Sequence, residues 1–263
     1  MKMDQTLENI IVSFAPLINE STNVGLSNNI KDLYFLMDLL VQKVKEEYQE
    51  IPCKNKCSMC CESFGLPRTT TIEWQIIFKY LTKNYSKENL KIVIDRTLKD
   101  HVPQLDQLMK EQARIQEPHT KRIKSQAPRP DFKCGYCPFL IEGSCSIYPV
   151  RPAICRAYGY FSIRVEGQSQ LFTCRPAADK MMSLLRENGV ENWVLPVWDK
   201  FAEKVFELNK DKPVATLPIW LLIHLDENNE LKNEIIKEPD FDKFYENFIS
   251  ISSKNSVNHS QLE

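Results

Sequence analysis

The residues of this chain best suited to chemistry are its nine cysteines, which fall into two groups. Short cysteine spacings are typical of zinc and iron–sulfur sites, in which thiolates are the ligands. No histidine lies in either group, so the sequence favours a soft site made of thiolates alone. The first group follows the pattern Cys-x3-Cys-x2-Cys-Cys and contains Cys53, Cys57, Cys60 and Cys61. The second group contains Cys134, Cys137, Cys145, Cys155 and Cys174.

The spacing of the first group predicts how its sulfurs are arranged. Pro52 suits the first position of a helix and Gly65 suits a stop, so we expect a short helix with four cysteines on one face. On such a helix the adjacent Cys60 and Cys61 point about 100° apart. This divergence favours two neighbouring metal sites, or a multinuclear cluster, over one ion. The arginines expected to offset the negative charge of the thiolates are Arg151, Arg156, Arg164 and Arg175.

The alternative interpretation is that these cysteines are only structural, because free cysteine is among the most buried residue types. Scattered core cysteines rarely gather at such short spacings, which favours metal binding. In a reducing compartment thiols stay unpaired, so grouped cysteines indicate metal binding or catalysis before disulfides.

Composition narrows the class of protein. Of the 263 residues, 43% are hydrophobic and 26% charged, and the formal net charge is −1. No global basic field favours nucleic acid, and the small basic patch at 121–124 with Arg129 is expected to be a solvated face. The longest apolar stretch, 215–225, contains Pro218 and is shorter than the ~20 residues of a membrane span. The N-terminus has no signal-peptide pattern. We therefore expect a soluble, cytoplasmic protein without a membrane contact.

The apolar periodicity predicts a mainly α fold with one small β-hairpin and a cysteine-rich irregular segment at 118–152. We expect a single metal-binding domain over 1–251, with its cysteine-cluster core at about 50–175 and a flexible tail over 252–263. His101 and His119 are expected to be exposed, and Trp193, Trp198 and Trp220 to be core. The hairpin is expected to pair 160–165 with 170–174. Helices are expected over 4–20, 30–50, 71–81, 86–117 with a bend at Pro103, 152–158, 176–188, 193–208, 217–225 and 241–251.

Three further motifs accompany the first cysteine group: Cys137-Pro-Phe-Leu, Gly143-Ser-Cys145-Ser-Ile-Tyr148 and Arg151-Pro-x-x-Cys155-Arg156-x-Tyr158. Together they resemble the YkgJ-type cysteine-cluster family, a proposed zinc- or iron-chelating domain, over about residues 50–175. Cys134 lies outside the family pattern. The resemblance implies metal ligation by Cys53, Cys57, Cys60, Cys61, Cys137, Cys145 and Cys155, with Cys174 as an eighth ligand.

Several functions are compatible with such a cluster. The first is a metal-binding protein that holds zinc, iron or an iron–sulfur cluster for storage, delivery, redox or structure. The second is a cluster-dependent enzyme, such as a redox enzyme or a protein lysine N-methyltransferase, because a related cysteine pattern occurs in flagellin lysine N-methylases that use S-adenosylmethionine. The third is a zinc-stabilised interaction module. A radical S-adenosylmethionine enzyme is disfavoured, because a long helix precedes the cysteines and no alternation of strands and helices follows.

Overall fold

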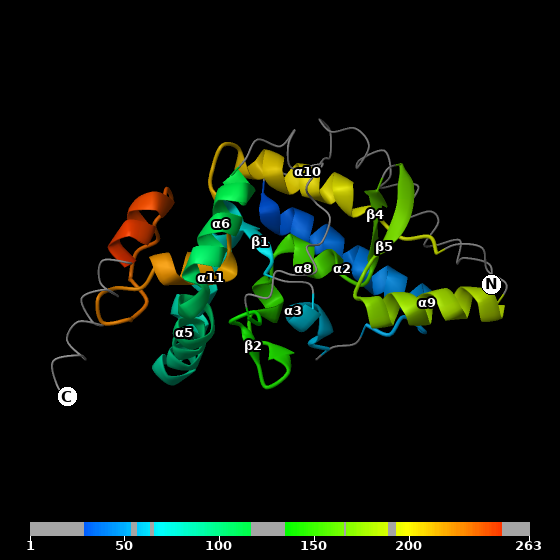
Figure 1. Cartoon of the computed structure of the whole chain (residues 1–263). Coiled ribbons are helices and arrows are strands. Elements are labelled where there is room, and N and C mark those ends of the chain that lie inside the picture. The colour runs from blue at the N-terminus through cyan, green and yellow to red at the C-terminus, as the bar shows by residue number, and fades with distance from the viewer. Residues whose placement is uncertain are drawn as a thin grey trace.

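The fold is mainly α, as predicted, and its sheets are all two-stranded within the described residues (Figure 1). The computed structural model describes residues 29–53, 57–63, 66–116, 135–165, 167–188 and 193–248. Some expectations lie outside these described residues: the helix over 4–20, the basic patch at 121–124 with Arg129, His119, Cys134 and the tail from 252.

Helix α2 (Ile30–Glu47) is the long helix that leads to the first cysteine group. It begins where the Asn29 side chain accepts a hydrogen bond of 3.0 Å from the Lys31 amide. Such a side-chain cap satisfies one of the amides that an N-terminus leaves without a partner. The helix ends three residues before the expected Glu50, and its apolar face is buried, as the periodicity predicted. The buried residues are Ile30, Leu33, Tyr34, Leu36, Met37, Leu40, Val41 and Val44.

Three helices follow in the order predicted. Helix α4 (Thr71–Asn84) starts with a capping box formed by Thr70 and Glu73. Helix α5 (Lys87–His101) starts at Ser86, whose hydroxyl accepts from the Asn89 amide at 3.2 Å. The expected bend at Pro103 is a turn of 3₁₀ helix, η1 (Val102–Gln104), after which α6 (Leu105–Gln116) continues.

The second half of the chain contains the predicted hairpin and further helices. Among the boundaries that differ, the second hairpin strand was expected over 170–174 and lies at 168–172, and the helix expected from 193 begins at Trp198 instead. The preceding residues are extended because the Pro196 carbonyl accepts a hydrogen bond of 2.9 Å from the Ser162 amide. The elements are α8 (Ala153–Ala157), β4 (Phe161–Val165), β5 (Gln168–Phe172), α9 (Arg175–Asn188), α10 (Trp198–Asn209), α11 (Leu217–Ile223) and a helix over 241–248.

Two short sheets were not predicted. Strand β1 (Arg68–Thr70) pairs antiparallel with β6 (Val214–Thr216). Strand β2 (Leu140–Ile141) pairs with β3 (Ser144–Cys145). Strands of two or three residues are too short for an alternating pattern, and β1 and β6 meet only through tertiary contacts.

The helix expected from Pro52 to Gly65 is wrong in extent. Among the residues of this stretch that the structure describes, α3 (Met59–Ser63) is helical, whereas residues 51–53 and 57–58 are not. Cys53 and Cys57 therefore do not share a helical face with Cys60 and Cys61. One physical reason is tertiary, because the Cys53 carbonyl accepts a hydrogen bond from the Tyr160 hydroxyl rather than from a following amide.

Helix α4 separates two hydrophobic cores. Ile72 and Ile76 face the first core, which we call the α2 core, and it lies among α2, α8, β4, β5 and α10. Trp74 and Ile77 face the second, the tryptophan core, which lies among α4, α5, α11 and the segment that includes Cys137, Phe139 and β2. In Figure 1, α8 lies beside α2, with α5, α6 and α11 to one side and β4, β5 and α9 to the other.

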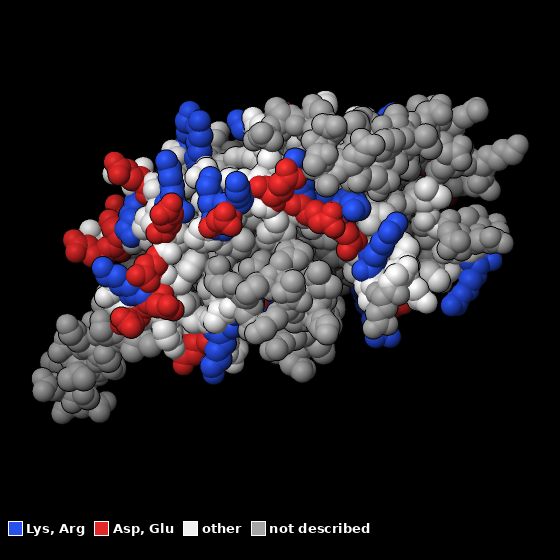
Figure 2. Space-filling model, turned by 90° about the horizontal axis from the view of Figure 1, so that it is seen from above, with Lys and Arg blue, Asp and Glu red and all other residues white. Residues whose placement is uncertain are grey.

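The length of the helices and the charge of the surface bear on which partners the described residues suit. No helix in the described ranges is both long and apolar enough to cross a bilayer. Figure 2 shows acidic and basic side chains interspersed where the face is described. A surface of mixed sign does not create the field that steers a polyanion.

Candidate metal centre

All eight cysteines expected as ligands lie among the described residues, and each of them is a free thiol. Cys57 is exposed, Cys137 and Cys174 are buried, and the others are intermediate. The first group lies between α2 and the end of α3, whereas the second belongs to the β2–β3 hairpin, α8 and the segment before α9. Segments almost one hundred residues apart in sequence thus contribute to one region.

One neighbourhood surrounds Cys53. Its thiol interacts electrostatically with those of Cys174, Cys57 and Cys60, in decreasing order. Its sulfur lies 3.9 Å from the Thr173 hydroxyl oxygen. Burial raises the pKa of Cys53 to about 11, so the thiol holds its proton at neutral pH until a metal displaces it.

A second neighbourhood surrounds Cys61. A hydrogen bond between the Cys61 and Cys137 side chains is the main reason why the pKa of Cys61 is raised to about 12. The two residues also meet through their backbones, because the Cys137 amide donates to the Cys61 carbonyl at 3.4 Å. Burial raises the pKa of Cys145, and that of Cys155 well above its usual range. The Cys155 thiol interacts with those of Cys145, Cys60 and Cys61.

Cys60 links the two neighbourhoods, which corrects one expectation. The adjacent Cys60 and Cys61 were expected to diverge, but their side chains are hydrogen-bonded to each other. That hydrogen bond, followed by burial, raises the pKa of Cys60. The Cys60 thiol also interacts with Cys53 on one side and with Cys155 on the other. Rotation about the Cα–Cβ bonds brings the two sulfurs together although their Cα–Cβ vectors differ in direction.

Gly159 makes room for the Cys53 sulfur. Its φ of +93° is a conformation that L side chains rarely adopt. A Cβ at this position would lie 2.3 Å from the Cys53 sulfur and 3.2 Å from its Cβ. The Gly159 amide donates to the Phe172 carbonyl at 2.7 Å, so the backbone is held in this close approach.

Two of the four expected arginines lie at the site. Arg151 and Arg156 are 8% and 3% exposed, and both form an ion pair with Asp38 of α2. The positive charge of Arg151 counteracts the rise in the pKa of Cys145, so it favours the thiolate there. The expectation for the other two is wrong, because Arg164 is exposed and the Arg175 side chain is 92% exposed.

Helix α5 supports the segment around Cys137, which the sequence did not predict. His101, expected to be exposed, is fully buried, and its Nε2 donates to the Tyr136 carbonyl at 3.0 Å. Arg96 donates to the Leu140 carbonyl. The only signal for His101 was its place in the last turn of a helix with other buried residues, such as Ile94 and Thr97. Of the expected core tryptophans, Trp220 is fully buried and Trp193 and Trp198 are partly buried.

The thiols are neighbours but do not form a closed coordination shell. Within the described ranges, no group of three or more His, Cys, Asp or Glu side chains has the arrangement of a metal site. The sulfurs instead make hydrogen bonds with one another and with Thr173. The donor set nevertheless suits a soft metal, because all the neighbours are thiols from segments that a metal would join.

Comparison with known proteins agrees with this donor set. No curated protein and no solved structure matches the chain significantly. Residues 52–176 match the model of the CxxCxxCC family, whose description is "Putative zinc- or iron-chelating domain". The matched segment contains all eight expected ligands and is not specific to the YkgJ-type members. The cysteine-rich segment is therefore similar to a family for which zinc or iron chelation is the described property.

Proposed function

We propose that this protein binds zinc or iron through two adjoining sets of four thiolates. The observation that carries the proposal is the chain of thiol interactions in which Cys60 has neighbours on both sides. The neighbours of Cys53 define the first set, and the neighbours of Cys61 and Cys155 define the second. The first set is Cys53, Cys57, Cys60 and Cys174, and the second is Cys61, Cys137, Cys145 and Cys155.

The chemistry of four thiolates suits either two zinc ions or an iron–sulfur centre. A bound metal would displace the thiol protons and cross-link α3, the β2–β3 hairpin, α8 and the segment before α9. Arg151 and Arg156 would offset part of the negative charge, because both are buried next to Cys145 and Cys155.

Metal analysis of the full chain, purified without oxygen, tests the proposal. We expect either two zinc ions and a colourless protein, or iron with inorganic sulfide and visible absorption. A folded wild-type protein without either metal would overturn the proposal.

Paired substitutions test the division into two sets. We expect Cys53→Ser with Cys57→Ser to remove the metal of the first set alone, and Cys137→Ser with Cys145→Ser that of the second set alone. Cys134→Ser is the matched control and should keep all the metal, because Cys134 lies outside the family pattern. Complete loss from either pair would indicate one multinuclear cluster and contradict the two-set arrangement.

A further inference from the structure

Glu73 is a buried carboxylate for which the metal centre has no direct use. It is 2% exposed, and none of the ion pairs in the described ranges includes it. Its Oε2 accepts from the amide and the hydroxyl of Thr70, at 2.9 and 2.8 Å. Its Oε1 accepts from the Ala153 amide at 2.8 Å and from the Tyr34 hydroxyl at 3.2 Å. A buried carboxylate needs such donors to offset the loss of water, so this geometry joins three elements through one side chain.

The bond to Ala153 caps another helix. Ala153 is the first residue of α8, and Pro152 at its N-cap has no side chain that accepts a hydrogen bond. The first amides of a helix have no partner within it. Glu73, from 80 residues earlier in the chain, therefore supplies an acceptor for the first amide of α8.

The other end of α8 is anchored to the same neighbours. Arg156 forms an ion pair with Asp38 of α2 and lies 4.1 Å above the ring of Tyr34. The Tyr34 hydroxyl donates in turn to Glu73. Cys155 lies between these two anchors, two residues after the Ala153 amide that Glu73 caps.

We propose that Glu73 is a positioning residue for the metal centre. From α4 it caps the start of α8 and thereby holds Cys155 beside the other thiols of the second set. Its role in the metal centre depends on the proposed metal binding, whereas its control of the Cys155 position does not. Thr70 and Glu73 also cap α4, so the test must separate these two roles.

The test measures the alkylation rate of each thiol in the metal-free full chain, resolved by mass spectrometry. We expect Glu73→Ala to increase the rate at Cys155 roughly tenfold or more, the order expected for the loss of a hydrogen bond to a charged group. The rate at Cys137, which Glu73 does not touch, should stay the same. In Glu73→Gln the amide oxygen can still accept from Ala153, so this variant should return Cys155 most of the way to its wild-type rate.

Thr70→Ala is the matched control. It removes the side-chain cap of α4 but leaves Glu73 Oε1 on the Ala153 amide, so Cys155 should react at the wild-type rate. Two results would overturn the proposal. One is an alkylation rate at Cys155 that rises as much in Thr70→Ala as in Glu73→Ala, and the other is an unchanged rate in folded Glu73→Ala. If Glu73→Ala unfolds the whole chain, alkylation of Cys137 becomes faster too. The rate at Cys155 is then measured in Tyr34→Phe, which removes one hydrogen bond to Glu73 Oε1. An alkylation rate at Cys155 that stays at the wild-type value in folded Tyr34→Phe would also count against the proposal.

Metal loading of the same variants separates this proposal from the proposed function. Glu73→Ala should lose metal from the second set and keep that of the first. If the wild-type protein binds no metal, the proposed function fails while the alkylation comparison still decides the role of Glu73. If Glu73→Ala retains all its metal with Cys155 protected, only the positioning role fails.

Discussion

The cysteine region and the tryptophan core are built in different ways. In the core, Trp74 and Trp220 stack with their ring centroids 5.9 Å apart, and both are fully buried. The cysteine region consists of short elements that are linked by hydrogen bonds and thiol contacts, and it meets the core through Cys137, Phe139 and Leu140. Apolar burial contributes about 25 cal/mol per Å² and needs no ligand. From this difference we expect the core to be stable without a ligand and the cysteine region to gain order when a metal binds.

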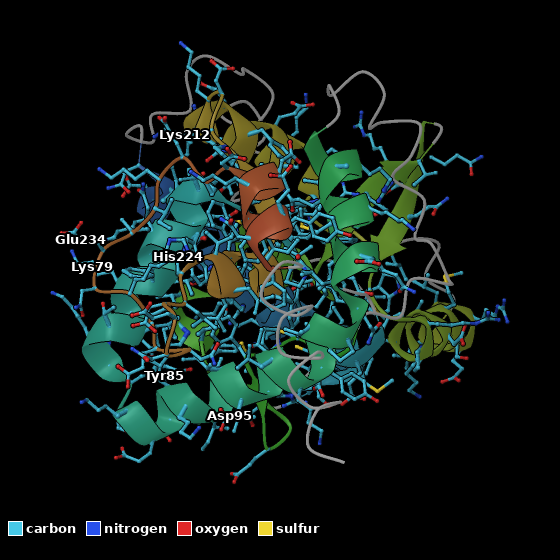
Figure 3. All side chains as sticks on the ribbon, turned by 60° about the vertical axis from the view of Figure 1, so that its left-hand side comes forward. Lys79, Tyr85, Asp95, Lys212, His224 and Glu234 are labelled. Carbon is cyan, nitrogen blue, oxygen red and sulfur yellow. The ribbon has the colours of Figure 1, made fainter. Side chains whose placement is uncertain are left out.

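The core also contains a buried polar network. His224 Nε2 accepts hydrogen bonds from the Ile236 amide at 2.9 Å and from the Trp74 indole at 3.4 Å. Its Nδ1 therefore carries the proton and donates to the Trp220 carbonyl at 2.7 Å. Figure 3 shows His224 within the packed side chains, whereas Lys212 and Glu234 lie at the periphery. All of these polar groups are satisfied without any metal.

Metal removal should produce the largest effect and tests the comparison directly. Under reducing conditions, a chelator should lower amide hydrogen-exchange protection in α3, the β2–β3 hairpin and α8, but leave α4 and α11 protected. Structural zinc contributes on the order of 10 kcal/mol in small zinc domains, so the change should be large. Equal loss of protection in both regions would contradict the distinction.

Trp220→Ala should produce the next largest effect. Loss of a fully buried indole from a packed core costs about 3–5 kcal/mol, which urea unfolding of the metal-loaded protein would measure. Phe35→Ala is the control, since this ring is 73% exposed and its loss should cost less than about 0.5 kcal/mol. An equal cost for both variants would show that the core is not the source of stability.

Acid should destabilise the core through His224. Burial lowers the pKa of His224 from 6.5 to about 4, so the folded state disfavours the imidazolium. The contribution of neutral His224 to the free energy of unfolding is complete above pH 6.5. It is lost as the pH falls toward 4, with a total change of about 3 kcal/mol. Unfolding curves of the metal-free protein between these pH values would measure it. In His224→Gln this part of the pH dependence should disappear, although the baseline stability is lower.

Gly159→Ala should affect the cysteine region in particular. A left-handed backbone costs about 1–2 kcal/mol for a residue with a Cβ, and the methyl group would displace the Cys53 sulfur. We expect loss of metal from the first set with retention of the second. Gly143→Ala is the control, because its φ is also positive but no atom lies near the new Cβ. Equal metal loss in both variants would indicate backbone strain rather than the contact with Cys53.

Ser86→Ala should produce the smallest of these effects. Loss of the hydroxyl that caps α5 costs about 1 kcal/mol, measured by thermal or urea unfolding. Because α5 belongs to the core side, the metal content should not change. Metal loss would show that α5, through His101 and Arg96, supports Cys137 more strongly than the comparison implies.

Local sequence signals predicted most helices correctly. The apolar period over 30–50, the Ser86 cap and Pro103 each indicate structure through contacts within a few residues, and such contacts do not depend on the rest of the fold. The eight cysteines were likewise identifiable, since thiolates at short spacings are rare outside metal sites. Their set of ligands stays a prediction that the paired substitutions test.

What only the tertiary structure decided is how those cysteines meet. Cys53 leaves the expected helix because its carbonyl is engaged by Tyr160, 107 residues away. Glu73 forms the capping box of α4 with one oxygen, and its second oxygen caps α8, a role that no sequence pattern indicated. The sequence alone determined the types of the donors and the helices that frame them, because spacing and periodicity are local. The arrangement of the sulfurs depends on hydrogen bonds between distant segments, which no local pattern encodes.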